Sequence, residues 1–153
     1  MPSPEANPNR YARLTLVSYA GDITPEQAWK LLSENPEAVL VDVRTDAEWR
    51  FVGVPDLASL GRDVVYIEWN GTDGKPNENF VADLREHVSA GEDRPVVFLC
   101  RSGNRSISAA EAATEAGITP SYNVLDGFEG QLDGDRHRGG RGWRAIGLPW
   151  TQT

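Results

Sequence analysis

Four short apolar runs constrain the fold of this chain more than any other feature of its sequence. They cover residues 38–43, 64–67, 95–99 and 121–125. The first and third runs are the most apolar and are rich in β-branched residues, which is typical of strands buried on both faces of a sheet. Segments with helical signals lie between the runs. We therefore predict an α/β fold of βαβ units around a mainly parallel sheet.

Helix-start signals occupy the segments between these runs. Thr24 and Thr45 each stand three residues before a glutamine or a glutamate, which is the spacing of a capping box. Asn77 is expected to cap a helix that ends at Gly91. The alanine-rich segment 104–116 is expected to form a helix packed close against the sheet.

Length and composition predict one ordinary domain. The 153 residues divide into an expected loose tail at 1–12 and a single domain at 13–153. No run approaches the roughly 18 apolar residues of a membrane span, and the N-terminus lacks the apolar core of a secretory signal. We therefore expect a cytoplasmic protein without a membrane partner. The net charge of −8 argues against nucleic acid as a partner.

The only cysteine of the chain, Cys100, directly follows the apolar run 95–99. Parallel sheets place reactive groups in the loops beyond the carboxyl ends of their strands, and Cys100 stands at such a place. A single cysteine excludes a disulfide within the chain and a cysteine-rich metal site. Any chemistry at Cys100 must therefore finish on an external acceptor.

The residues after Cys100 are typical of an anion-binding loop. Backbone N–H groups at a helix start can form a nest for an anion, and the helix N-terminus adds partial positive charge. Arg101 and Arg105 would add two full charges, so that every one of these effects favours thiolate over thiol. A cysteine at a strand end is often an inert core residue. Here no aliphatic side chain follows until Ile107, which favours the reactive interpretation.

Four stretches together resemble a single-domain rhodanese, a member of a sulfurtransferase family. They are residues 39–44 (Val-Leu-Val-Asp-Val-Arg) with Glu48 and Trp49, residues 100–106, residues 122–128 and residues 142–149. Their order and spacing match the family across residues 20–150. The resemblance implies a central, mainly parallel five-stranded sheet with helices on both faces.

The resemblance also implies a mechanism. Cys100 would attack the outer sulfur of a small anionic donor such as thiosulfate and become a persulfide, and cyanide or a thiol would then remove that sulfur. A protein is a further candidate acceptor, and neither a metal nor an organic cofactor is implied. The substrate-binding residues would be Arg101, Ser102, Gly103, Asn104, Arg105 and Ser106.

In the same family an acid–base pair, here Asp42 and Arg44, lies beneath the active-site loop. We expect it to support the structure rather than to take part directly in catalysis. One departure concerns residues 52–57, which read Val-Gly-Val-Pro-Asp-Leu where many members carry Gly-His-Ile/Leu-Pro. The shape of residues 56–62 is therefore not predicted.

Two alternatives to a thiosulfate-type sulfurtransferase stay open at this point. A persulfide carrier or sensor would accept sulfur from a partner enzyme and pass it on. Dual-specificity phosphatases and arsenate reductases resemble the same pattern but place five residues between cysteine and arginine. Here four residues separate Cys100 from Arg105, and the shorter loop favours sulfur over phosphate. Residues 130–142 form a long polar loop that is either a surface connection or a border of the active site.

Overall fold

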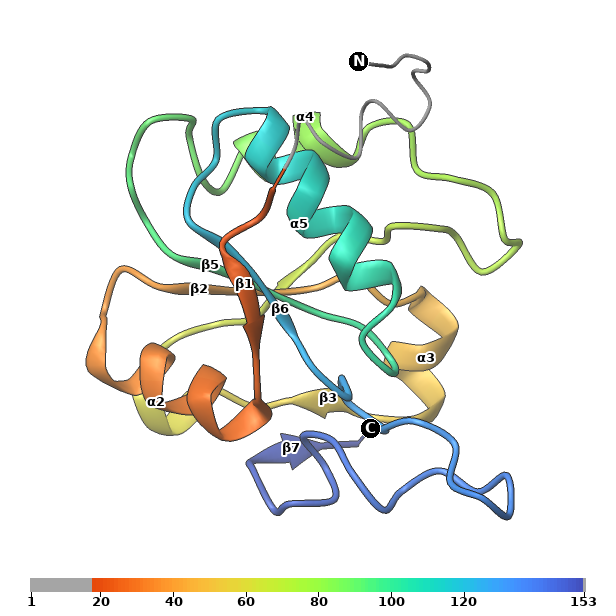
Figure 1. Ribbon diagram of the computed structural model, residues 1–153. Coiled ribbons are helices and arrows are strands. Elements are labelled where there is room, and N and C mark those ends of the chain that lie inside the picture. The colour runs from red at the N-terminus through yellow and green to blue at the C-terminus, as the bar shows by residue number, and fades with distance from the viewer. Residues whose placement is uncertain (1–17, 153) are drawn as a thin grey trace, which may run out of the picture.

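Five short strands form a wholly parallel sheet in the computed structural model, which describes residues 18–152 (Figure 1). In spatial order they are β1 (Gly21–Ile23), β6 (Ser121–Val124), β5 (Val96–Leu99), β2 (Val39–Asp42) and β4 (Val65–Tyr66). Every residue of β2 and β5 is buried, because each strand lies between two others and is covered on both faces. The predicted α/β architecture is confirmed. The expected tail, residues 1–12, lies outside the described residues.

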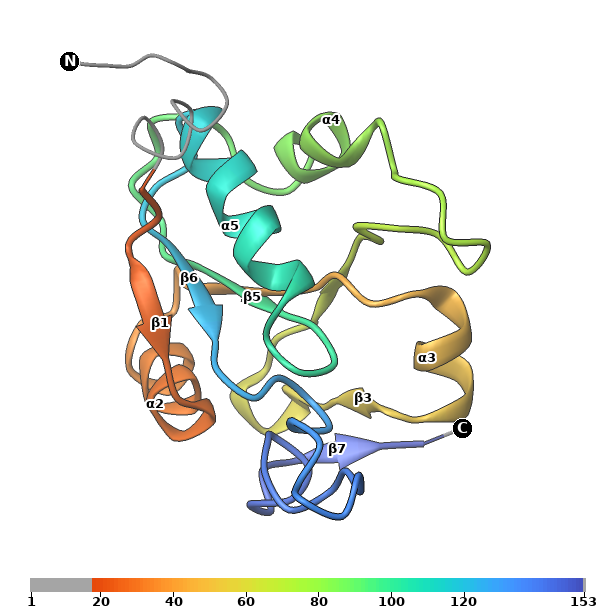
Figure 2. The same cartoon turned by 45° about the vertical axis from the view of Figure 1, so that its right-hand side comes forward.

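Helices cover both faces of this sheet (Figure 2). Helices α4 (Phe80–Arg85) and α5 (Arg105–Glu115) lie on one face, and α2 (Pro25–Glu34) lies on the other. Side chains alternate along β5, so that Phe98 and Cys100 join the core cluster on the α4 and α5 face. Leu99 joins the cluster beneath α2. None of the helices in residues 18–152 is long and apolar enough to cross a membrane.

Both predicted capping boxes are present. Thr24 caps α2, and Thr45 caps α3 (Asp46–Phe51), in each case with reciprocal bonds to the side chain three residues on. These bonds satisfy N–H groups that a helix N-terminus otherwise leaves unpaired. The short helix α3 is thereby fixed directly after the end of β2.

The helix predicted to begin at Asn77 is different in the structure. Helix α4 covers only Phe80–Arg85, with Asn79 as its N-terminal cap residue, and turns rather than helix lead on to Gly91. The Asn77 side chain instead accepts the Asn79 N–H at 3.0 Å and donates to the Glu68 carbonyl at 2.8 Å. These bonds form a turn before the helix, which is the alternative that asparagine offers to helix initiation.

Several short elements were not predicted from the sequence. Strand β1 has only three residues, and β3 (Val54–Pro55) forms a separate antiparallel pair with β7 (Trp150–Thr151). Residues 56–62, whose shape the sequence left open, contain the 3-10 turn η2 (Ala58–Leu60). The β3–β7 pair places the C-terminal segment beside β3 and the segment that follows β6 (Figure 2).

Candidate active site

Three loops meet where β2, β5 and β6 end. The Val43 N–H donates to the Leu99 carbonyl at 2.8 Å, which joins the first loop to the second. The Phe128 N–H donates to the Cys100 carbonyl at 2.8 Å, which joins the second to the third. Gly127 has a φ of +57°, and a Cβ there would collide with the carbonyl oxygens of Cys100 and Arg101. The glycine therefore allows the third loop to lie directly on the cysteine loop.

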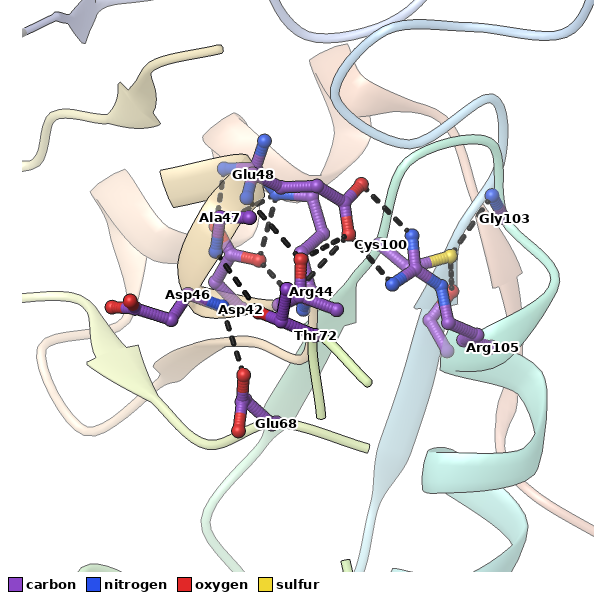
Figure 3. Close-up of polar contacts among 12 residues, drawn as sticks. Asp42, Arg44, Asp46, Ala47, Glu48, Glu68, Thr72, Cys100, Gly103 and Arg105 are labelled. Atoms are coloured by element: carbon purple, nitrogen blue, oxygen red, sulfur yellow. Dashed lines mark hydrogen bonds and ion pairs between the residues drawn. The ribbon is translucent and has the colours of Figure 1, made fainter. Parts of the chain in front are cut away.

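Cys100 is 1% exposed and makes polar contacts that an inert core cysteine does not need. Its Sγ accepts the Gly103 N–H at 3.1 Å and lies 3.1 Å from the Ser106 hydroxyl (Figure 3 shows the Gly103 contact). Gly103 has a φ of +101°, a conformation that turns its N–H back toward the sulfur and favours glycine. Ser106 lies in the first turn of α5, so that the sulfur faces the N-terminus of this helix.

The cysteine loop carries backbone donors without protein acceptors. Gly103 donates to sulfur, and within the described part of the chain five other N–H groups of the loop make no hydrogen bond. They belong to Arg101, Ser102, Asn104, Arg105 and Ser106. Free N–H groups at the start of a helix are the donors that bind anions in proteins.

Arg105 does not add a free positive charge to the loop, as the sequence had suggested. Its guanidinium forms two bonds with the Glu48 carboxylate of α3, at 2.8 and 3.0 Å (Figure 3). Burial alone raises the pKa of Glu48, but the bond and charge of Arg105, the Thr45 N–H and the charge of Arg44 lower it below its ordinary value. Burial likewise lowers the pKa of Arg105, and the bond and charge of Glu48 raise it beyond its ordinary value. The sequence indicated Glu48 as part of a capping box and of the family pattern but not as the partner of Arg105, whose charge it balances.

The remaining loop residues divide into exposed and buried ones. The side chains of Arg101 and Asn104 are exposed, whereas Ser102 is buried. The Ser102 carbonyl accepts a bond from Gln131, and the Arg101 carbonyl accepts the N–H groups of Glu129 and Gly130. The first residues of the long polar loop 130–142 therefore lie against the cysteine loop and border the site.

Sequence reasoning missed a line of polar side chains behind Ser106. The Ser106 hydroxyl donates to the Asn123 Oδ1 on β6, and the Asn123 Nδ2 donates to the Asp22 carboxylate on β1 at 3.0 Å. Tyr19 donates to the same Asp22 oxygen at 2.7 Å. An asparagine in the middle of the apolar strand pattern was the one available signal. Its partner on β1 could not be identified from the sequence, because that strand itself was not predicted.

Asp42 and Arg44 form a fully buried ion pair at the end of β2. The Arg44 Nη2 lies 2.7 Å from the Asp42 Oδ2, and it also donates to the Gly53 carbonyl at 2.9 Å. The Arg44 guanidinium stacks over the Phe128 ring at 4.3 Å, and the Phe128 N–H holds the Cys100 carbonyl. The pair therefore connects β2, the β3 segment and the two loops that meet at the cysteine.

Replacement of Asp42 with alanine is expected to lower the stability of the fold by about 3 to 5 kcal/mol, because it leaves the Arg44 charge buried without its partner. Urea unfolding measures this loss. Asp46→Ala is the control, because Asp46 pairs with Arg50 on the surface and its loss should cost under about 1 kcal/mol. Normal stability with lost activity would instead give Asp42 a direct part in catalysis.

Glu48→Gln is expected to lower stability at pH 7 by about 1 to 3 kcal/mol, because the charged bonds to Arg105 are weakened. The folded protein holds the pKa of Glu48 below its ordinary value of 4.5, so this stabilisation is present above that value. It disappears as the pH falls through the lowered pKa, and the difference between variant and wild type should shrink there. Glu37→Gln, which loses an exposed contact with Arg94, is the control. A difference that persists unchanged in acid would contradict this account.

Comparisons with known proteins identify the family of this chain. A family model described as the STR4 middle domain, a rhodanese-like family, matches residues 20–153. An uncharacterized protein of Rickettsia conorii is 36% identical over 129 residues, which cover 84% of this chain and 95% of that protein. The thiosulfate sulfurtransferase GlpE of Actinobacillus pleuropneumoniae is 27% identical over 84% of this chain and 90% of its own length.

Solved structures show the same relationship. The crystal structure of Rv0390 from M. tuberculosis is 71% identical, with a TM-score of 0.84 over 89% of this chain and all of that one. The polysulfide-sulfur transferase homodimer of Wolinella succinogenes is 26% identical, with a TM-score of 0.58 over 86% of this chain and 78% of that one. With its sequence motifs, its sheet order and the loop at Cys100, this chain belongs to the single-domain rhodanese family.

Proposed function

We propose that this protein is a sulfurtransferase that carries a sulfane sulfur as a persulfide on Cys100. The observation that carries the proposal is the position of the Sγ. It accepts the Gly103 N–H inside a loop whose other N–H groups have no acceptor among residues 18–152. A cysteine that only filled the core would need neither the Gly103 bond nor a loop with unbonded N–H groups. An anion bound to or attached to the sulfur would use them.

The reaction divides into two half-reactions. The Cys100 thiolate attacks the outer sulfur of a donor such as thiosulfate, a new S–S bond forms, the S–S bond of the donor breaks, and sulfite leaves with its electron pair. The negative charge then rests on the outer sulfur of the persulfide. Cyanide or a thiolate attacks that sulfur and leaves as thiocyanate or as a new persulfide, and Cys100 returns as thiolate. No net oxidation or reduction is needed from outside.

The charges of the loop indicate different roles for its two arginines and for its backbone N–H groups. Because Glu48 neutralises Arg105, this arginine supports the structure of the loop and does not act as an unpaired cation. Arg101 is exposed and forms no ion pair with any residue between 18 and 152. We assign to Arg101 the attraction of the anionic donor, and to the backbone N–H groups the binding of the persulfide.

The named relatives share a class of substrate. One is called a thiosulfate sulfurtransferase and the other a polysulfide-sulfur transferase, so both names refer to the movement of sulfur. A small sulfane-sulfur anion as donor and a thiol or cyanide as acceptor fit the proposed chemistry, and a protein thiol is a further acceptor. These relatives support the proposal at the level of sulfur transfer, and the choice between thiosulfate and polysulfide is left to experiment.

Incubation with thiosulfate is expected to add about 32 Da, one sulfur atom, to the intact mass of the wild type but not to that of Cys100→Ser. Cyanide should remove the adduct and release thiocyanate. An adduct that neither cyanide nor thiols remove would indicate a persulfide carrier. The absence of an adduct with thiosulfate and with polysulfide, together with hydrolysis of an aryl phosphate, would replace the proposal with a phosphatase.

Arg101→Gln is expected to raise the KM for thiosulfate by about three- to tenfold and to leave kcat nearly unchanged, because a long-range attraction acts on donor binding. The effect should shrink at high salt. Steady-state kinetics measure both parameters. Arg85→Gln, which removes an exposed arginine from α4, is the control and should change neither. An unchanged KM in Arg101→Gln would assign donor attraction to another group.

A further inference from the structure

A continuous line of hydrogen bonds runs from the sheet edge to the sulfur of Cys100. Asp22 of β1 and Asn123 of β6 are paired neighbours in the sheet, and their side chains meet at 3.0 Å. Asn123 then contacts Ser106, whose Oγ lies 3.1 Å from the Cys100 Sγ. Asp22 is exposed, whereas Asn123 and Ser106 are completely buried. Two buried polar side chains thus connect a surface carboxylate with the sulfur.

The carboxylate determines the direction of every bond in this line. An ionised carboxylate only accepts hydrogen bonds, so Asn123 must turn its NH₂ group toward Asp22. The Asn123 amide oxygen therefore faces Ser106 and accepts the hydroxyl proton. Ser106 has no second proton, so at the sulfur its oxygen can only accept. By geometry alone either atom of the Cys100–Ser106 contact could be the donor. The directions of the other bonds in the line leave the thiol as the donor and the Ser106 oxygen as the acceptor.

Reversing this direction would be costly. For Ser106 to donate to a thiolate, its hydroxyl must stop donating to Asn123, which leaves a buried amide oxygen without a hydrogen-bond donor. Turning the amide over would instead place its oxygen against the Asp22 carboxylate. Tyr19 anchors that carboxylate from the other side, and burial together with Asp22 raises the pKa of Tyr19 to about 12, so that it remains a donor.

We propose that Asp22 and Asn123 are positioning residues that fix the hydrogen-bond direction at Cys100, so that Ser106 accepts from the thiol instead of donating to the thiolate. In this direction the line gives one hydrogen bond to the thiol and none to the thiolate, whereas the loop amides and the helix N-terminus favour the thiolate. Arg105 stands beside Ser106 in the first turn of α5, and its charge is neutralised by Glu48 of α3. If the proposed function holds, the persulfide also lacks this bond, because its inner sulfur has no proton.

Alkylation of Cys100 tests the direction of the bond without any sulfur transfer. Only the thiolate reacts with iodoacetamide, so the rate at about pH 6 divided by the rate at about pH 10 reports the ionised fraction and corrects for access to the sulfur. Ser106→Ala should raise this ratio roughly two- to tenfold, the effect of one lost neutral hydrogen bond. A fall in the ratio would show that Ser106 donates to the thiolate and would overturn the proposal.

Asp22→Asn tests the origin of the direction. Without an obligate acceptor at position 22, Asn123 can turn over, Ser106 can donate to the thiolate, and the ratio should again rise roughly two- to tenfold. Asp126→Asn is the matched control, because it removes the same charge from a residue whose backbone lies against Gly103 but which has no bond in the line. If the ratio of rates rises no more in Asp22→Asn than in Asp126→Asn, the loss of a negative charge alone explains the rise, and the proposal is overturned.

A further variant separates position from charge. Tyr19→Phe keeps the Asp22 carboxylate and should leave the ratio within about twofold of wild type. Thermal unfolding of each variant measures whether the substitution has destabilised the fold. A destabilised fold would change the alkylation rates at low and high pH together and would leave their ratio unchanged. If wild-type protein gains no sulfur from thiosulfate or polysulfide, the proposed function fails while these ratios still test the hydrogen-bond direction.

Discussion

The buried Asp42–Arg44 pair is the interaction on which the architecture around Cys100 depends. Arg44 reaches from the end of β2 to the Gly53 carbonyl and lies over the Phe128 ring. Phe128 in turn holds the Cys100 carbonyl through its N–H. A buried ion pair contributes little net stability compared with a well-packed apolar pair, but the loss of one partner is severe. The value of this pair is that it fixes three loops in one arrangement, which apolar contacts alone would define less sharply.

The positive charge around the cysteine is balanced in part. The helix N-terminus and the loop amides supply partial positive charge, and the partly buried guanidinium of Arg105 is matched by Glu48, whereas Arg101 is exposed. Glu48 serves two structures at once, because the same carboxylate caps α3 and binds Arg105. Because of this shared use, the position of α3 depends on the cysteine loop, and the position of the cysteine loop depends on α3. A substitution in either segment should therefore affect both, although Glu48 and Arg105 are 57 residues apart in the sequence.

Much of this structure could be predicted from local sequence because the informative residues act locally. The apolar runs at β2 and β5 and the capping boxes at Thr24 and Thr45 carry their signals within a few residues. The three-residue strand β1 and the β3–β7 pair have too few residues for a pattern, and they form because distant segments meet. The partners of Arg105 and Ser106 could not be predicted for the same reason, because they too come from distant segments. The loop at Cys100 could be identified from the residue types that directly follow the apolar run 95–99. Glu48, Asn123 and Asp22 reach the site only through contacts between segments that are distant in the sequence.

The alternation of side chains along the sheet explains why support and chemistry lie on opposite sides of the cysteine loop. Cys100 continues the face of β5 that carries Phe98, so its sulfur meets the first turn of α5 and the serine there. Arg44 lies over Phe128, which belongs to the cluster on the α2 face. The ion pair can therefore fix the backbone of the loop from one side without contacting the sulfur. The polar contacts of the sulfur are made by Ser106 and Gly103 instead, so that the groups around the sulfur and the ion pair that supports the loop are separate.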